Sequence, residues 1–563
     1  MASAEEGATA PGSAAGAADG PANGPSPARD AAATRDAAQV SPWAPIARAD
    51  FRSLWLASIA SYVGTWVQGV AAVWLMTSLS PSPAMTALVQ TASSLPLVLL
   101  ALPAGALADV VDRRRLLVAS QAWMFAAAAL LAVLAALGWT SPRVLLLLTM
   151  ALGVGSAFTA PAWQAIQTDL VPRDELPAAI ALGSAAVNGA RAIGPAIGGL
   201  LVSAVGPPAA FAANAVSFLA VQAALLSWRR EQPSSELPRE EVFGAIRSGL
   251  RFARHSPGLQ RIVSRLALFV VGASALWAIL PVLARRDMGL DAFGYGVLLG
   301  GFGLGAVAGT VALPRLRSAL GTDRMIDACT FAFAASLSVV GLVPAPPVAM
   351  LALFVAGLSW MAVLSSLNAA AQTAVPGWVR ARALAVLLLV MQAGIAVGSA
   401  AWGWIAARQG TPNAFFAAAA TLFACGVAAL RVRLPDTSRA DFTPAEFRLP
   451  SELAGSIDHD EGPVLVTIEY EVDPARTDAF LDTMQAVRRM RRRRGAWRWG
   501  LFADAERRDT WVESFLVESW LDYLRQRERL TVVDREIGKR AIAFHVSERP
   551  PVVRYLVARA PIG

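Results

Sequence analysis

The stretch GARAIGPAIGG, residues 189–199, decides the fold, because part of it recurs later in the chain. AIGP at 192–195 aligns with AVGS at 396–399, an offset of 204 residues (396 minus 192). Other correspondences keep that spacing to within one residue: Gly199 with Gly403, Gly105 with Gly309, and Gln167 with Gln372. A pattern repeated at a fixed offset predicts two halves of similar structure that follow one another along the chain.

Apolar runs fill both halves. Of the 563 residues, 55% are hydrophobic and only 16% are charged, whereas soluble domains carry roughly 25% charged residues. A helix needs about 20 apolar residues to cross a bilayer. Twelve runs reach this length, near 54–78, 84–108, 116–138, 143–169, 176–204, 208–228, 260–284, 292–313, 324–343, 347–374, 381–407 and 411–430. The sequence therefore predicts an all-α membrane protein, a bundle of two six-helix halves with a binding site between them.

Arginine residues mark one side of this bundle. They cluster after every second run, within 113–115, 229–254, 315–324 and 380–382 and at Arg173. Because positively charged loops stay in the cytoplasm, we expect both termini to be cytoplasmic, in a multi-pass protein of the bacterial inner membrane. The formal net charge of +8 is explained by this topology, so no nucleic-acid partner is expected.

Composition divides the chain further. A disordered N-terminal tail (1–42), rich in Ala, Gly, Pro and Ser, precedes the first half. The predicted order continues with the N-terminal half (43–228), a cytoplasmic connector (229–258), the C-terminal half (259–430), a polar linker (431–462) and a cytoplasmic C-terminal domain (463–563).

The C-terminal domain alternates strand and helix patterns. Strands are expected at 464–470, 497–502 and 511–517, and helices at 475–490 and at 521–539, the latter in one piece or two. The order strand, helix, strand, strand, helix is typical of a small α+β ferredoxin-like fold. The arginine run at 488–494 contacts either anionic lipid or only solvent.

One ionised residue lies deep in an apolar run. Arg191 is costly there unless it faces a cavity or a partner, so we expect it in the substrate pathway, bound to an anionic or carbonyl group. The alternative is a structural arginine bonded to backbone carbonyls. Polar side chains expected in the same pathway are Asn188, Gln68, Gln164, Gln167 and Gln392. Further in-span candidates for an amphiphilic pocket are Gln90, Gln372, Trp66, Trp277, Trp360 and Trp402.

Two motifs resemble the major facilitator superfamily. GALADVVDRRRLL at 105–117 resembles its loop signature, with departures at Val110 and Asp112. The resemblance implies a conformational latch between the halves, made by Gly105, Asp109, Arg113 and Arg114; the alternative is that the arginines only set topology. The stretch at 189–199 matches a signature associated with exporters, carried by Gly189, Gly194, Pro195, Gly198 and Gly199.

Motifs near the start of the membrane region show which branch of this superfamily the chain resembles. FRSLWL at 51–56, GTWVQ at 64–68 and Leu95-Pro96 are similar to the transmembrane secretion effectors, over residues 43–435. This resemblance implies secondary active export of siderophore- or drug-like small molecules by proton antiport. No acidic residue lies in the middle of a span and no phosphate-binding loop is present, so the residues that couple protons are not identified.

The C-terminal domain resembles those related to antibiotic-biosynthesis monooxygenases, which often dimerise. We expect a transporter and not an enzyme, without metal or other cofactor, with a small-molecule substrate, contacts with membrane lipid and a homodimer through this domain. One alternative is a fused cofactor-free oxygenase acting on the cargo, with a pocket lined by Trp497, Trp499, Trp511 and His545. Another alternative is an importer or lipid transporter on the same fold.

Overall fold

The computed structural model describes residues 41–172, 174–228, 251–435, 458 and 461–559. The side chains of a few helical residues inside these ranges, among them residues 109, 164 and 167, also lie outside the description. The expected N-terminal tail and most of the connector and linker therefore fall outside the described residues.

The first half of the bundle is helical throughout. After the short helix α2 (Ala44–Ala47), it contains α3 (Ala49–Leu79), α4 (Pro83–Val110), α5 (Arg113–Ala136), α6 (Pro142–Leu170), α7 (Leu176–Ala204) and α8 (Pro207–Ser227). Proline is the first residue of α4, α6 and α8. Its fixed φ suits the first helical turn, where an N–H would have no helical acceptor.

The second half repeats this plan. It contains α10 (Pro257–Ala273), α11 (Ala275–Arg286), α12 (Ala292–Leu320), α13 (Thr322–Leu342), α14 (Pro346–Thr373), the 3-10 helix η1 (Gly377–Val379), α15 (Arg380–Gln409) and α16 (Thr411–Ala429). Among the described residues, 12 segments are long and apolar enough to cross a membrane. The prediction of twelve spans is confirmed, although the seventh is divided into α10 and α11 at the buried Ser274.

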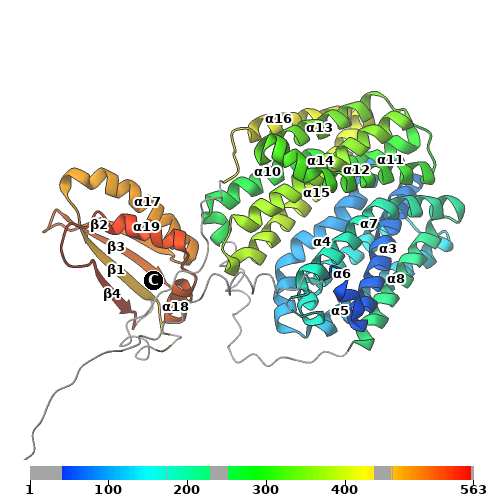
Figure 1. Ribbon diagram of the computed structural model, residues 1–563. Coiled ribbons are helices and arrows are strands. Elements are labelled where there is room, and N and C mark those ends of the chain that lie inside the picture. The colour runs from blue at the N-terminus through cyan, green and yellow to red at the C-terminus, as the bar shows by residue number, and fades with distance from the viewer. Residues whose placement is uncertain (1–40, 173, 229–250, 436–457, 459–460, 560–563) are drawn as a thin grey trace, which may run out of the picture.

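The repeated glycines lie where the two halves meet. A Cβ atom on Gly199 of α7 would come within 2.5 Å of the Ala292 carbonyl oxygen of α12, and one on Gly403 of α15 within 2.3 Å of Ala87 Cβ of α4. Figure 1 shows the two halves side by side, with α4 and α7 turned toward α15 and α12. Close helix approach in a membrane needs small residues, which accounts for the repeat in the sequence.

The C-terminal domain, called the tail domain below, is a four-stranded antiparallel sheet with the order β2-β3-β1-β4. Its elements are β1 (Val464–Glu471), α17 (Thr477–Arg494), β2 (Arg498–Ala503), β3 (Thr510–Val517), α18 (Trp520–Glu528), α19 (Val532–Ile542) and β4 (Val552–Val557). The expected strands and helices are present, and the second helical region is in two pieces, α18 and α19. The sequence prediction missed β4, an edge strand whose side chains are mostly exposed.

Three arginines of the run at the end of α17 bind other groups inside the tail domain. Arg491 pairs with the fully buried Glu513 at 3.0 Å, and Arg493 pairs with Asp534. Arg494 donates to the Gln526 carbonyl oxygen, and burial lowers its pKa to about 9. These three arginines therefore match neither of the two expectations for the run, since they face protein and not lipid or solvent.

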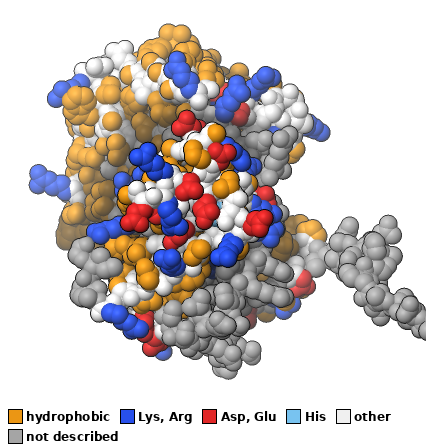
Figure 2. Space-filling model, turned by 90° about the vertical axis from the view of Figure 1, so that its left-hand side faces the viewer, with side chains coloured by type: hydrophobic (Ala, Val, Ile, Leu, Met, Phe, Trp, Pro, Cys, Tyr) orange, Lys and Arg blue, Asp and Glu red, His pale blue; other side chains and the backbone are white. Residues whose placement is uncertain are grey.

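The tail domain packs against the bundle through the end of the connector and η1. Arg251 donates to the Gly495 carbonyl oxygen at 2.5 Å. Phe252 is 2% exposed, and its ring meets Trp378 edge-on and lies 5.7 Å from the Arg493 guanidinium. Seen from this side, charged side chains of both signs gather over the tail domain, with apolar surface on the bundle behind it (Figure 2).

His255 lies near the guanidinium groups at this contact, and we expect it to make the contact sensitive to pH. Partial burial and the nearby guanidinium groups, first that of Arg492, lower the pKa of His255 in the docked state. The docked state therefore disfavours the protonated ring, and docking weakens as pH falls through the ordinary histidine pKa of about 6.5. We expect faster amide exchange at 251–256 and 488–495 near pH 5.5 than near pH 7.5, after correction for intrinsic rates. The change should disappear in His255→Gln; an equal change in that variant would contradict the prediction.

Candidate functional site

The two halves are joined at the face opposite the tail domain, called the far face. Arg285, at the end of α11, donates to Thr77 Oγ1 at 2.8 Å and to Ser78 Oγ. Its guanidinium also lies 5.1 Å from the ring of Trp74, which stacks on Tyr295 of α12. The last turn of α3 carries the negative end of the helix dipole, so a guanidinium there stabilises closure of this face.

Two further contacts close the far face. Arg286 donates to the Pro81 carbonyl oxygen, in the connection between α3 and α4. Ser203 of α7 donates to Asp291 Oδ2 at 2.8 Å, and Asp291 also accepts from the Gly294 backbone N–H. These hydrogen bonds, first that from Gly294, lower the pKa of Asp291 and keep it ionised.

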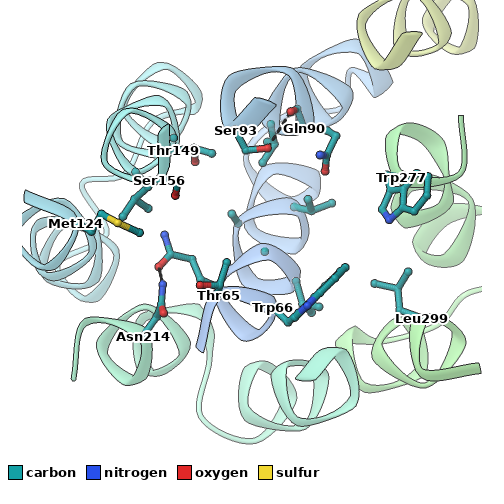
Figure 3. Close-up of a pocket in the computed structure, with 18 of the residues that line it drawn as sticks. Thr65, Trp66, Gln90, Ser93, Met124, Thr149, Ser156, Asn214, Trp277 and Leu299 are labelled. Atoms are coloured by element: carbon teal, nitrogen blue, oxygen red, sulfur yellow. Dashed lines mark hydrogen bonds between the residues drawn. The ribbon is translucent and has the colours of Figure 1, made fainter. Parts of the chain in front are cut away.

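A cavity of about 160 Å³ lies inside this closed face. It is lined mainly by the N-terminal half, and α11 and α12 of the C-terminal half contribute Trp277, Tyr295 and Leu299. In Figure 3, Trp66, Trp277 and Leu299 group on one side, and Met124, Thr149, Ser156 and Asn214 on the other. The described lining holds hydroxyls, amides, a thioether and aromatic rings, but no Lys, Arg, His, Asp or Glu. Such a surface suits an amphiphilic molecule without a full charge at this position.

Hydrogen bonds fix part of this lining, and one buried hydroxyl in it has no partner among the described residues. Asn214 donates to Gln68 Oε1 and accepts from Ser217 Oγ, so the Gln68 side chain is held in place. The Thr149 hydroxyl is buried and has no hydrogen-bond partner among the described residues. A buried polar group without a partner is costly, so Thr149 is suited to bond a polar atom of a ligand.

Among the expected pathway residues whose side chains are described, Gln68 lines the cavity. Arg191 lies outside the lining, half-buried in α7, and its Nη1 donates to Asn188 Oδ1 at 3.4 Å. Gln392 is half-buried in α15, also outside the lining. The side chains of Gln164 and Gln167 lie outside the described residues. Of the further pocket candidates, Gln90, Trp66 and Trp277 line the cavity.

The expected latch residues are spread over the tail-domain side of the first half. Arg114 donates to the Leu225 and Leu226 carbonyl oxygens, both at 2.7 Å, and so caps the end of α8 within the same half. At Gly105, no described atom of another element lies within 4 Å of the position that a Cβ atom would take. Arg113 is the first residue of α5, and the side chain of Asp109 lies outside the described residues.

The motif of α7 positions the cavity wall. A Cβ atom on Gly194 would come within 2.6 Å of Trp66 Cβ, and one on Gly198 within 2.9 Å of Val67 Cα. Pro195 is buried beside them. Gly189 has no neighbour that a Cβ would meet. The motif therefore brings α7 against α3 in its far-face half and sets the position of Trp66.

Comparison with known protein families shows which family the chain belongs to. The family described as transmembrane secretion effector matches residues 40–561. The chain belongs to this family. It is a membrane transporter of the major-facilitator type. In this transmembrane secretion effector, the residues matched by the family include the tail domain as well as the bundle.

Relatives with described functions are transporters. The chain is 26% identical to the staphyloferrin A transporter of Staphylococcus aureus over 283 residues, 49% of this chain and 70% of that protein. It is also 26% identical to the multidrug efflux pump Tap of Mycobacterium bovis over 406 residues, 69% of this chain and 94% of the pump. An auto-inhibited POT family peptide transporter has the same bundle fold, with a TM-score of 0.58, 14% identity, and coverage of 69% of this chain and 98% of that structure.

Proposed function

We propose that this secretion effector exports small amphiphilic molecules, siderophore- or drug-like, from the cytoplasm by alternating access. The observation that carries the proposal is the uncharged cavity between the halves, with the free Thr149 hydroxyl inside a closed far face. The efflux pump and siderophore transporter among its relatives support this class of cargo.

The proposed orientation places the tail domain and both termini in the cytoplasm, with the bundle in the bacterial inner membrane. The arginine-rich connections at 113–115 and 315–324 lie on the tail-domain side, as the positive-inside rule requires of a cytoplasmic face. The cavity is then closed toward the periplasm. In the proposed cycle, this is the conformation that takes up cargo from the cytoplasm.

Proton antiport is the proposed source of energy. Arg191, Gln68 and the motif around Pro195 belong to the proposed machinery, with Arg191 acting on the route between the cytoplasm and the cavity. The latch of Gly105, Asp109, Arg113 and Arg114 is proposed to engage when the cytoplasmic side closes.

The tail domain is proposed to be ferredoxin-like, non-enzymatic and able to pair two copies of the chain. Its strand order supports this fold. The alternative is an oxygenase pocket in this domain. It is less favoured because two of its expected lining residues, His545 and Trp499, hydrogen-bond to other groups of the domain. His545 Nδ1 accepts from the Glu471 backbone N–H and its Nε2 lies 2.8 Å from the Arg549 carbonyl oxygen, while Trp499 Nε1 donates to Glu513.

Binding to the cavity can be tested with two isosteric variants. Thr149→Val removes the free hydroxyl in the cavity, and Thr140→Val removes another buried hydroxyl without a partner, outside the lining. In purified protein titrated with a panel of siderophore-like molecules and dyes, we expect roughly fivefold weaker binding of at least one ligand in Thr149→Val. Equal affinity of both variants for every bound ligand would place the binding site elsewhere.

A further inference from the structure

A second cavity, of about 500 Å³, lies where the end of α12, the start of α13 and the end of α16 meet Arg265, midway along α10. Figure 1 places α13 and α16 on the side of the C-terminal half that is turned away from the N-terminal half. This cavity is therefore separate from the space between the halves, and no step of the proposed transport uses it.

Charged groups dominate its lining. Arg265 of α10 pairs with Asp323 at 2.5 Å and with Asp327, both on α13. The Arg265 side chain is 2% exposed, and its buried Nε has no hydrogen-bond partner among the described residues. Arg324 and Arg433 complete the set; both are exposed and have no ion-pair partner in the described part of the chain. Three guanidinium and two carboxylate groups give the described part of the lining a formal charge of +1 (three minus two).

The start of α13 adds to this positive potential. Gly321 is its N-cap residue, and no side chain caps the N–H groups of the first turn. Gly321, Thr322 and Asp323 all line the cavity. Uncapped N–H groups and the positive end of the helix dipole favour an anion at this position.

Two apolar side chains form the rim of the same cavity. Leu320, the last residue of α12, is 42% exposed, and Leu430, just after α16, is 48% exposed. At the ends of membrane-spanning helices, exposed leucines are placed where they can contact the acyl chains of surrounding lipid. The cavity thus combines a charged floor with an apolar rim at the level where headgroups meet acyl chains.

We propose that this cavity binds the headgroup of an anionic phospholipid that carries hydroxyl groups, such as phosphatidylglycerol. The phosphodiester, with one negative charge, matches the +1 lining and lies between Arg324, Arg433 and the start of α13. The headgroup hydroxyls donate to the remaining acceptor positions of Asp323 and Asp327. The first acyl carbons contact Leu320 and Leu430. The bound lipid joins the ends of α12, α13 and α16 without entering the transport route.

The test uses the full chain purified in detergent and stripped of lipid. Retention of phosphatidylglycerol, phosphatidylcholine and inorganic phosphate is measured by native mass spectrometry. The double variant Arg324→Ala/Arg433→Ala is compared with Arg315→Ala/Arg431→Ala, which removes two exposed arginines near the same helix ends that do not line the cavity.

We expect phosphatidylglycerol to bind wild type and the control variant about equally, and the cavity variant roughly tenfold more weakly. Phosphatidylcholine should bind all three proteins weakly. Equal retention of phosphatidylglycerol by the cavity and control variants would overturn the site. Binding of inorganic phosphate as tightly as phosphatidylglycerol would overturn the lipid assignment. Because the readout is lipid binding, a failed export assay leaves this result unaffected.

Discussion

Arg285→Ala is expected to open the far face and shift the protein toward the conformation accessible from that side. The substitution removes charged hydrogen bonds to Thr77 and Ser78 and the contact with the Trp74 ring. A hydrogen bond to a charged group contributes about 1.5–3 kcal/mol and an exposed cation–π contact about 0.5–1 kcal/mol. A net loss of about 2 kcal/mol changes the ratio of the two conformations roughly thirtyfold.

Cysteine labelling measures this shift. Ser156→Cys places a reporter in the cavity wall, in a chain whose Cys329 and Cys425 are replaced by serine. A membrane-impermeant maleimide applied from the far face should label it much faster when Arg285 is alanine. Arg143→Ala, an exposed far-face arginine at the start of α6, is the matched control and should leave the rate unchanged. Unchanged labelling in Arg285→Ala would show that the far face is held closed by other contacts.

Gly305→Ala is expected to prevent accumulation of folded protein. A Cβ atom on Gly305 of α12 would lie 1.9 Å from the Phe354 carbonyl oxygen of α14. The obstacle is backbone, which cannot rotate away as a side chain can, so the two helices must separate. Overpacking of side chains alone costs about 1–3 kcal/mol, and we expect a larger loss here.

Gly189→Ala is the control for this substitution. Gly189 is also helical, and apart from its chain neighbours and the adjacent backbone of α7, no atom of the described residues lies within 4 Å of the position of its Cβ. Alanine at an open helical position gains up to about 1 kcal/mol of helix propensity. Gly189→Ala should therefore keep a monodisperse size-exclusion peak and melt at the wild-type temperature or above it. Gly305→Ala should give no monodisperse peak. Normal yield of Gly305→Ala would contradict the close approach of α12 and α14.

The bundle was predictable because its signals are local. Apolar runs and the repeat containing Gly199 and Gly403 need no knowledge of tertiary contacts, and the glycines at 199 and 403 mark where the halves meet. The edge strand β4 was not predictable in the same way. Its residues Val552 and Val553 are both largely exposed, so the strand lacks a buried face that would set a clear alternation.

The cavity depends on tertiary structure and was only partly foreseen. Gln68, Gln90, Trp66 and Trp277 were identified because polar or large aromatic residues stand out in apolar runs. Thr149 and Asn214 carry no such signal, since a threonine or asparagine in a span is often bonded within the protein. The far-face role of Arg285 was also missed, because in sequence it reads as an ordinary flanking arginine.

The measurement that tests export most directly is uptake into energised inverted membrane vesicles, in which export from the cell becomes accumulation in the lumen. The substrate is whichever molecule of the panel binds the purified protein. We predict accumulation that a protonophore abolishes and that Thr149→Val reduces, while Thr140→Val transports like wild type. Accumulation that is indifferent to the protonophore, or is seen only in right-side-out vesicles, would contradict proton-driven export through this cavity.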